Sequence, residues 1–143
     1  MKLKELMSRQ VITVDPEETV AVAARMLARH NIGSLPVSGR DGKLLGLVTD
    51  RDLVTRCLAA GRRPEDTKIR EVMTSGVISA GPDMEVWAAA HLMGRSQIRR
   101  LPVVEEGKLQ GMVSLGDLAN REETAFDATD ALTGISSNIS VRE

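Results

Sequence analysis

The 143-residue sequence has few aromatic residues, one cysteine and almost no net charge. It contains one Trp, one Phe and no Tyr, and its formal charge at pH 7 is −1. Nucleic-acid binding draws on a basic surface, and single-strand binding usually needs aromatic stacking platforms, so we do not expect nucleic acid as a partner. Cys57 is the only cysteine, and no disulfide can form within the chain.

Membrane segments and catalytic motifs are missing as well. No stretch approaches the roughly 20 consecutive apolar residues of a membrane-spanning helix, and the N-terminus lacks the apolar core of a signal peptide. We therefore expect a cytoplasmic protein without a membrane partner. His30 and His91 stand apart in the sequence, and no nucleophile–base pair, metal-ligand cluster or phosphate loop is visible. The sequence thus predicts no enzyme, no catalytic residue, no metal site and no obligatory cofactor.

An internal duplication is the main signal in the sequence. A shift of 66 residues aligns Met7 with Met73 and residues 35–37 with residues 101–103. After Asp41 is skipped, the shift becomes 65 and continues to the end of the repeat. Over the 50 aligned pairs, 20 are identical. The chain therefore contains the same structural unit twice.

Each copy reads as a βαββα unit. Residues 11–14 predict a strand, and Asp15 predicts the N-cap of a helix that begins at Pro16. Two further strands, joined by a Gly-rich turn, lead to a second helix expected from Asp50. The predicted fold class is α+β, with helices and strands mixed in each unit. The predicted divisions are repeat 1 at 1–60, a connector at 61–68, repeat 2 at 69–120 and a mobile C-terminal extension at 121–143.

Both repeats end in the same pattern: Gly, two apolar residues, a hydroxyl residue, two further positions and Asp, at 46–52 and 111–117. Thr49 and Ser114 are expected where a strand passes into a helix, whose free amides attract anions. The Asp could accept the two hydroxyls of a ribose, and the Gly would allow a ligand to approach the strand closely. The same spacing is also that of a capping box, in which the Asp accepts the cap amide. Both interpretations stay open.

The two repeats together resemble the CBS domain pair, a regulatory module named after cystathionine beta-synthase. The resemblance covers residues 1–120 and rests on both copies of four motifs: Met-Ser/Thr (at Met7 and Met73), Val-Ile-Thr/Ser, apolar-Pro-Val and the hydroxyl-x-x-Asp ending. It implies two repeats packed sheet to sheet with pseudo-two-fold symmetry. It also implies an energy-sensing homodimer that acts on an unidentified regulated protein. The implied ligand is AMP, ADP, ATP, NAD or S-adenosylmethionine, bound in clefts between the repeats.

The resemblance assigns roles to single positions. Asp52 and Asp117 would bind ribose, while Thr49 and Ser114 would approach ribose or phosphate. Aliphatic side chains would enclose the adenine, because aromatic residues are so few. The residues implied to line that pocket or complete its apolar walls are Val11, Ile12, Thr13, Leu35, Pro36, Val77, Ile78, Ser79, Leu101 and Pro102.

A phosphate group calls for cations, and the resemblance points first to Arg100, with Arg99 beside it and Arg51 as a further candidate. Repeat 1 has Gly33 and Ser34 where repeat 2 has the arginine pair, and Arg51 has no basic counterpart in repeat 2. The two clefts are therefore expected to differ in charge. A solvated surface position is the alternative interpretation of each arginine.

Two functions are compatible with these features. The first is a ligand-sensing regulatory module that binds an adenosyl compound. The alternative is a constitutive dimerisation or protein-interaction module with empty clefts, for which Trp87 is a candidate interface anchor.

Overall fold

The computed structural model describes the backbone of residues 1–142 and the side chains of residues 1–137. The chain forms two compact units that do not coincide with the two repeats along the sequence. Unit 1 contains Met1–Val11 and the chain from Ile78 onward, and unit 2 contains Ile12–Val77. The first residues of the chain therefore fold with the second repeat, and the residues just before Ile78 fold with the first repeat.

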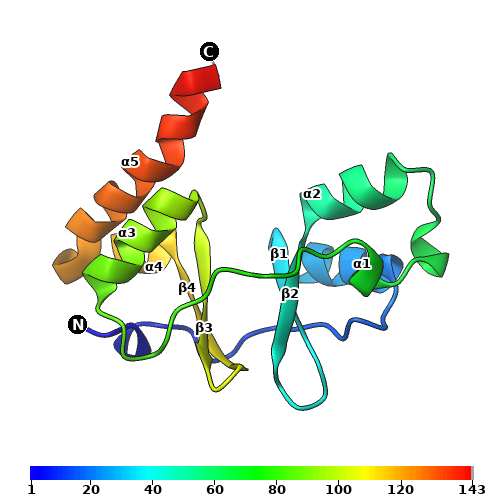
Figure 1. The fold of residues 1–143 in the computed structure, drawn as a ribbon, viewed down its shortest axis with the longest axis horizontal. Coiled ribbons are helices and arrows are strands. Elements are labelled where there is room, and N and C mark those ends of the chain that lie inside the picture. The colour runs from blue at the N-terminus through cyan, green and yellow to red at the C-terminus, as the bar shows by residue number, and fades with distance from the viewer. Residues whose placement is uncertain (143) are drawn as a thin grey trace. The chain divides into compact units, whose positions relative to one another are not determined.

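Unit 2 is built on one antiparallel β-hairpin (Figure 1). Its strands are β1 (Ser34–Ser38) and β2 (Leu44–Thr49). Its helical elements are α1 (Val20–His30), α2 (Asp50–Asp52), the π-helical turn η2 (Leu53–Leu58) and the 3₁₀ turns η3 (Pro64–Asp66) and η4 (Ile69–Glu71).

Unit 1 repeats this plan on a second antiparallel hairpin. Its strands are β3 (Arg100–Glu105) and β4 (Lys108–Ser114), and the two residues that join them, Glu106 and Gly107, have φ angles of 53° and 80°. Positive φ at both positions is the requirement of a tight two-residue hairpin turn. Its helical elements are the 3₁₀ turn η1 (Leu3–Glu5), α3 (Val86–Ser96), α4 (Leu115–Ala119), the 3₁₀ turn η5 (Glu122–Thr124) and α5 (Ala125–Arg142).

Backbone hydrogen bonds explain why the N-terminus belongs to unit 1. In unit 2, residues 67–70 are hydrogen-bonded to residues 16–20. In unit 1, residues 1–4 make the corresponding bonds to residues 82–86. The segment that precedes each repeat therefore completes the unit of the other repeat, and the same local contacts are formed twice.

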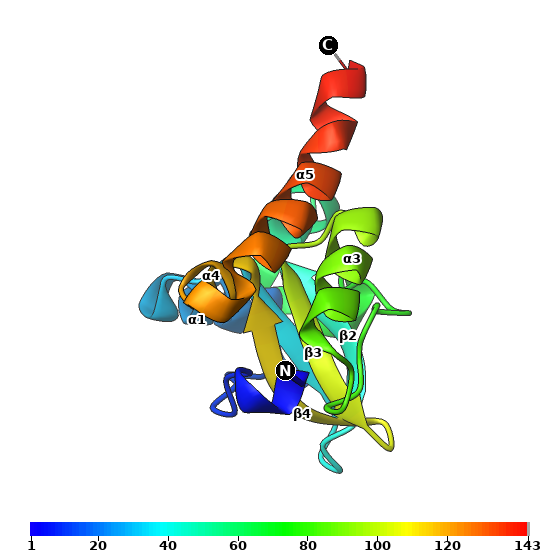
Figure 2. The same ribbon diagram turned by 90° about the vertical axis from the view of Figure 1, so that its left-hand side faces the viewer.

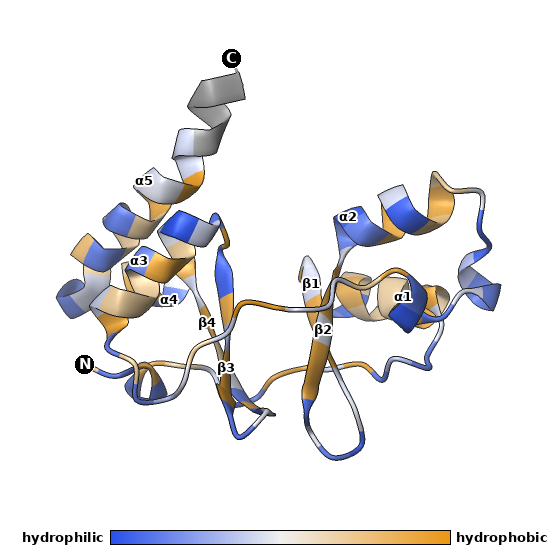
Figure 3. Ribbon diagram, in the orientation of Figure 1, coloured by the Kyte–Doolittle hydropathy of each residue, from blue (hydrophilic) through white to orange (hydrophobic). Residues whose placement is uncertain are grey.

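Each unit has its own hydrophobic core. Leu35, Val37 and Val48 of unit 2 have no exposed surface, and neither have Leu101 and Val103 of unit 1. Figure 3 shows the strands as largely hydrophobic and the hairpin ends as hydrophilic. The expected α+β class is confirmed: helices and small antiparallel sheets are mixed in both units.

The predicted start of the first helix is wrong. Helix α1 begins at Val20, and Thr19 is its N-cap, with Oγ1 accepting the Val22 amide at 3.3 Å. Asp15 instead accepts the Glu17 amide at 2.8 Å and forms a turn. The carbonyls of residues 16 and 18 accept hydrogen bonds from residues 70 and 69. They are therefore unavailable to a helix, and the helical ladder starts only after them.

The predicted strand at 11–14 is reduced to a single bridge. Val14 alone pairs with β1, in a parallel bridge to Val37. Ala80 forms the corresponding bridge to Val103 in unit 1. The chain passes from unit 1 to unit 2 between Val11 and Ile12, directly before this bridge.

The glycine that precedes each hydroxyl residue has a structural function. Thr74 exchanges two backbone hydrogen bonds with β2, and Ser8 does the same with β4. A Cβ on Gly46 would lie 2.5 Å from the Thr74 carbonyl oxygen, and one on Gly111 would lie 2.6 Å from that of Ser8. These glycines therefore admit the chain's own Met-Ser/Thr segments. The expectation that they admit a ligand is corrected, because this space is already occupied.

The C-terminal region is a packed helix. Figure 2 shows α5 running along α3, and in this helix Ala131 is fully buried and Ile135 is 8% exposed. A Cβ on Gly134 would lie 2.6 Å from the backbone of Gly94, so the two helices cross in close contact. The predicted mobile extension is therefore wrong for residues 122–137. Residue 143 and the side chains of 138–142 lie outside the described part of the chain.

None of the helices in the described part of the chain has the length and hydrophobicity of a bilayer-spanning segment.

Candidate functional site

The hydroxyl and the Asp of each repeat form a capping box at the start of a helix. The Asp52 amide donates to Thr49 Oγ1 at 3.1 Å, and the Thr49 amide donates to Asp52 Oδ2 at 2.9 Å. The same two bonds join Ser114 and Asp117, at 3.1 and 2.8 Å. The capping interpretation is therefore correct for both copies. It leaves the second carboxylate oxygen of each Asp free of backbone hydrogen bonds among the described residues.

The surroundings of that second oxygen differ between the repeats. Asp52 Oδ1 lies 3.7 Å from Nε of Arg56, and the Asp52 side chain is 13% exposed. Asp117 has no cationic nitrogen within 4.0 Å among residues 1–137. Sequence reasoning missed Arg56, although its position four residues after Asp52 on a helix would have indicated the pair.

In unit 1 the strand and helix ends bring together a basic edge, which we call the unit 1 edge: Arg99, Arg100, Ser114 and Asp117. Arg100 faces Ser114 across β3 and β4, and the Leu115 amide donates to the Arg99 carbonyl at 2.9 Å. Both arginine side chains are exposed, and neither has an acidic partner within 4.0 Å in the described chain. This edge therefore presents two uncompensated guanidinium groups beside a helix start.

The corresponding unit 2 edge consists of Gly33, Ser34, Thr49 and Asp52. Ser34 faces Thr49 across β1 and β2. The Asp50 amide donates to the Gly33 carbonyl at 3.0 Å. The backbone arrangement matches that of the unit 1 edge, but the arginine pair is replaced by small residues. Arg51 is exposed on the following helical turn.

The expected adenine-pocket residues are distributed over both units. Ile12, Thr13 and Val77 belong to unit 2 and are half-buried. Val11, Ile78 and Ser79 belong to unit 1; Val11 is half-buried, while Ile78, which is 41% exposed, and Ser79 are at the surface. Ile12 and Thr13 directly precede Val14, which pairs with β1, and Ile78 and Ser79 directly precede Ala80, which pairs with β3. They therefore lie beside the strand whose first residues form the edge.

The leucines of the two proline-containing strands are not pocket walls. Leu35 and Leu101 are 0% exposed and belong to the two hydrophobic cores. Pro36 and Pro102 are buried, and their carbonyls accept the amides of residues 14 and 80. A fully buried side chain offers no surface to a ligand. The implied role of Leu35 and Leu101 as apolar walls is therefore corrected to that of core residues, and the role of Pro36 and Pro102 stays a prediction.

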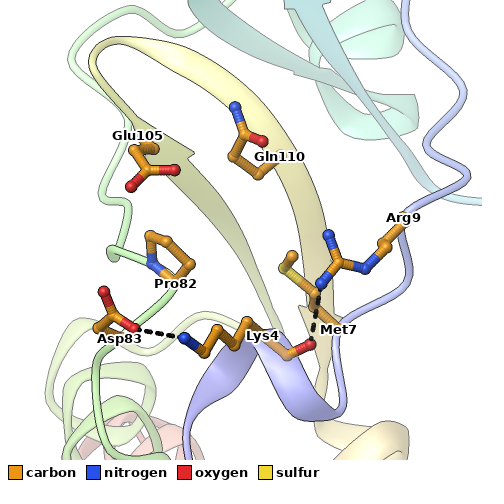
Figure 4. A pocket seen from close by; sticks show the side chains of 7 residues that line it. All are labelled: Lys4, Met7, Arg9, Pro82, Asp83, Glu105 and Gln110. Carbon is orange, nitrogen blue, oxygen red and sulfur yellow. Dashed lines mark hydrogen bonds and ion pairs between the residues drawn. The ribbon is translucent and has the colours of Figure 1, made fainter.

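A small cavity in unit 1 contains none of the predicted site residues (Figure 4). Its volume is about 160 Å³, and its lining residues are Lys4, Met7, Arg9, Pro82, Asp83, Glu105 and Gln110. Pockets that enclose organic ligands usually measure about 300–1,000 Å³. An adenosyl compound therefore does not fit this cavity.

Two of the charged residues that line this cavity, Lys4 and Asp83, form an ion pair within the unit. Lys4 Nζ lies 3.0 Å from Asp83 Oδ1, and Arg9 donates to the Lys4 carbonyl at 3.4 Å. The hydrogen bond from Lys4, with the nearby charge of Lys2, lowers the pKa of the Asp83 carboxyl below its ordinary value. In unit 2 the corresponding carboxyl is Glu17, whose pKa is lowered mainly by a hydrogen bond from Lys68. These ion pairs join residues 1–4 to the turn that precedes α3 and residues 67–70 to the turn that precedes α1.

His30 and His91 are exposed on α1 and α3, and Cys57 is fully buried. Among the residues that the structure describes, no three His, Cys, Asp or Glu side chains converge as a metal site would require.

Comparison with known proteins connects this geometry to a family. The CBS domain family model matches residues 3–59 and 69–136. The chain is 42% identical over 134 residues to the CBS domain-containing protein YhcV of Bacillus subtilis, covering 94% of each chain. It also resembles the crystal structure of Hypoxic Response Protein I with two coordinated zinc ions. That match has 32% identity and a TM-score of 0.78, and it covers 85% of this chain and 98% of the other.

A second similar structure is informative about ligands. The CBS domain pair of protein MJ0100 was crystallised with 5′-methylthioadenosine and S-adenosyl-L-methionine. It matches with 32% identity and a TM-score of 0.72, over 83% of this chain and 93% of that one. The duplicated repeat, the two hairpin units and these matches lead to one conclusion: the chain belongs to the CBS domain family and consists of a pair of CBS domains.

Proposed function

We propose that this protein is a ligand-sensing regulator that binds an adenosyl compound at the unit 1 edge and the unit 2 edge. CBS domain pairs are regulatory modules, and the chain contains one. The candidate ligands are AMP, ADP, ATP, NAD and S-adenosylmethionine. The proposal assigns the protein no catalytic activity.

One observation carries the proposal: both edges present an Asp with one carboxylate oxygen that the cap does not use, next to a hydroxyl at a helix start. The Asp amides occupy the acceptor positions of the Thr49 and Ser114 hydroxyls, which leaves each hydroxyl proton available for donation. Carboxylate oxygens accept ribose hydroxyls, and helix starts favour phosphate. The complex of the MJ0100 pair with two adenosyl compounds supports this ligand class.

The unit 1 edge is proposed as the stronger phosphate site. Arg99 and Arg100 supply two cations there, and their counterparts at the unit 2 edge are uncharged. We therefore expect ATP and ADP to prefer the unit 1 edge. A ligand without a phosphate group should distinguish the two edges much less.

A thermal-shift panel tests the function. At a ligand concentration 100-fold above its Kd, a true site adds about 2.7 kcal/mol to the free energy of unfolding. At least one of the five compounds should raise the Tm of protein that has been freed of bound nucleotide. If none does, the sensor function is overturned and the alternative, a constitutive interaction module, is favoured.

Two substitutions separate ligand binding from helix capping. Asp52→Asn and Asp117→Asn keep an oxygen that can accept the cap amide but lose the charged second oxygen. We expect each to weaken binding at its own edge at least about tenfold, because a charge-assisted hydrogen bond to ribose is lost. The Tm of the unliganded protein should change little. Unchanged affinity in both variants would show that the carboxylates serve only as caps.

We propose a second copy of the chain as a partner, docked on α1 and η2 of unit 2. Ala24 and Ala28 are exposed on α1, and Val54 and Leu58 are 54% and 58% exposed on η2. The positions that correspond to the two alanines in unit 1 are buried beside α5. Light scattering should report a dimer for the wild type and a monomer for Leu58→Asp. A monomeric wild type would contradict this arrangement.

The regulated protein is proposed to recognise a surface that changes with ligand occupancy. Trp87, which is 66% exposed on α3, is the candidate anchor for it. Affinity capture with the wild type and Trp87→Ala, each with and without the compound that raises the Tm, should yield a partner that depends on both. Mass spectrometry of small molecules that co-purify with the protein would identify the natural ligand directly.

A further inference from the structure

Arg56 connects the candidate ribose carboxylate to a distant part of the chain. Its Nε lies 3.7 Å from Asp52 Oδ1. Its Nη1 donates to the carbonyls of Val72 and Met73, both at 3.2 Å. One guanidinium therefore contacts the unit 2 edge and the segment that leads out of unit 2, an arrangement that we call the Arg56 clamp.

The backbone of η2 brings Arg56 to this place. The helix that begins after Thr49 widens into a π-helical turn, with the Ala59 amide donating to the Val54 carbonyl at 2.8 Å. Arg56 is thereby kept in a continuous helix, four residues after Asp52. Single π-helical turns of this kind often occur at functional sites.

The second repeat has the same residue but a different backbone. Arg121 is the counterpart of Arg56 at the shift of 65 residues. Helix α4 ends at Ala119, and Arg121 has extended dihedral angles of −117° and 133°. It therefore lies outside the helix, and in the described chain it forms no ion pair with Asp117. Within these described residues, the Arg56 clamp has no equivalent in unit 1.

The clamped segment is itself a structural junction. Directly after Met73, the Thr74 amide donates to the Leu47 carbonyl of β2 at 2.8 Å, and the Leu47 amide donates back at 3.0 Å. The segment then runs to Val77, the last residue of unit 2. Its attachment to β2 determines where the covalent connection between the two units begins.

We propose that Arg56 is a positioning residue that couples occupancy of the unit 2 edge to the attachment of residues 72–74. Ribose hydroxyls bound to Asp52 compete with Arg56 for Oδ1, the one oxygen of this carboxylate that the cap leaves uncommitted. A displaced guanidinium no longer donates hydrogen bonds to the carbonyls of Val72 and Met73. The backbone bridge between Thr74 and β2 is then less stable. This inference rests on the proposed function of the edge, and it names the element through which binding is transmitted.

Residue-resolved hydrogen exchange of the Thr74 amide, measured by NMR, tests the coupling. In the ligand-free protein, Arg56→Met should accelerate this exchange about tenfold, because two charge-assisted hydrogen bonds next to the bridge are lost. Arg56→Lys, which retains the charge and the aliphatic stem, should still accelerate it, because an ammonium cannot span all three acceptors. Arg121→Met is the matched control and should leave Thr74 exchange unchanged.

The same exchange measurement is then repeated with ligand, using whichever of AMP, ADP, ATP, NAD and S-adenosylmethionine raises the wild-type Tm. Saturation with that compound should accelerate Thr74 exchange in the wild type and cause no further acceleration in Arg56→Met. The Arg56→Met variant should also bind it about three- to fivefold more tightly, because a competing cation of ordinary surface ion-pair strength has been removed.

The failures of the two proposals give different results. If none of the five compounds binds, the proposed function fails, and the coupling fails with it. The other case is a compound that binds, with lower affinity in Asp52→Asn, and yet leaves the hydrogen exchange of the Thr74 amide unchanged. In that case the proposed function stands and the coupling is overturned. Unchanged Thr74 protection in both Arg56 variants without ligand would also overturn it.

Discussion

The two units of this protein are built from the same repeat, and they differ in the course of the chain after the hydroxyl–Asp pair. In unit 2 the chain continues as the helical turn η2, which places Arg56 against Asp52. In unit 1 helix α4 ends at Ala119, and the chain turns into α5, which covers α3. Equivalent capping boxes therefore lead to two different carboxylates. Asp52 lies beside Arg56, whereas Asp117 has no cationic nitrogen within 4.0 Å among residues 1–137.

The comparison shows that local rules and long-range packing act on different parts of the repeat. The capping boxes recur because each depends on residues only three positions apart. The bridges from Thr74 and Ser8 to the Gly-containing strands recur as well, because both copies of the repeat contain the segments that pair. The covering of α3 and the exposure of α1 depend on a segment that occurs once. The capping boxes are therefore the same in both units, while the residues around them differ.

The largest effect is expected from a substitution that disrupts the packing of α5 on α3. In Gly134→Ala the new Cβ would lie 2.6 Å from the backbone of Gly94, which cannot move without displacing a whole helix. We expect a loss of about 3 kcal/mol in the free energy of unfolding, measured by urea denaturation. Gly116→Ala is the control, because its Cβ would meet only the Ser114 hydroxyl at 3.6 Å. An equally stable Gly134→Ala would show that α5 is not held against α3.

A second pair of substitutions tests the feature that the units share. Gly46→Ala and Gly111→Ala would place a Cβ 2.5 and 2.6 Å from the carbonyls of Thr74 and Ser8. Each substitution should lower the free energy of unfolding by about 2 kcal/mol, because the bridging segment must shift away from its strand. The two losses, compared by urea denaturation, should agree within about 0.5 kcal/mol. A large loss of stability at one glycine alone would show that the Thr74 and Ser8 bridges are not equivalent.

Substitutions at the N-caps of α1 and α3 should change the free energy of unfolding by smaller amounts and in opposite directions. Thr19 caps α1 through the Val22 amide, whereas Glu85 at the start of α3 makes no side-chain cap. Thr19→Ala should lower the free energy of unfolding by about 1 kcal/mol. Glu85→Asp supplies a capping side chain and should raise it by about 0.5 kcal/mol. Both can be measured as shifts in Tm, and destabilisation by Glu85→Asp would contradict the cap assignment.

The smallest expected effect is a loss of stability at acid pH, to which both units contribute. The carboxyls of Glu17 and Asp83 have pKa values below their ordinary ones because of Lys68 and Lys4. A lowered pKa in the folded state means that the unfolded chain takes up the proton first as the pH falls. The stabilisation is therefore fully present above the ordinary carboxyl pKa and is lost as the pH falls through the lowered value.

The measurement compares the Tm of the wild type with that of Glu17→Gln and Asp83→Asn from neutral to acid pH. Each variant should melt below the wild type at pH 7, and the difference should vanish at low pH. A difference that persists when both carboxyls are protonated would assign it to packing instead of charge.

Much of the fold could be predicted from the sequence. The duplication, the two hairpins and both capping boxes depend on residue spacings that are visible in the printed chain, and the structure contains them all. The predicted cap at Asp15 failed, because a distant segment occupies the carbonyls that a helix would need there. The implied pocket walls Leu35 and Leu101 failed because burial depends on the packing of whole units.

The sequence by itself determined the family, the two helix-start edges and their unequal arginine content. Spacing and composition suffice for these features, because capping and strand pairing are short-range. Only the tertiary structure decided that residues 1–11 complete the second repeat, that α5 covers α3, and that Arg56 rather than Arg121 reaches its Asp. Those outcomes depend on contacts between segments far apart in the chain, and on where a helix ends, which neighbouring residues alone do not specify.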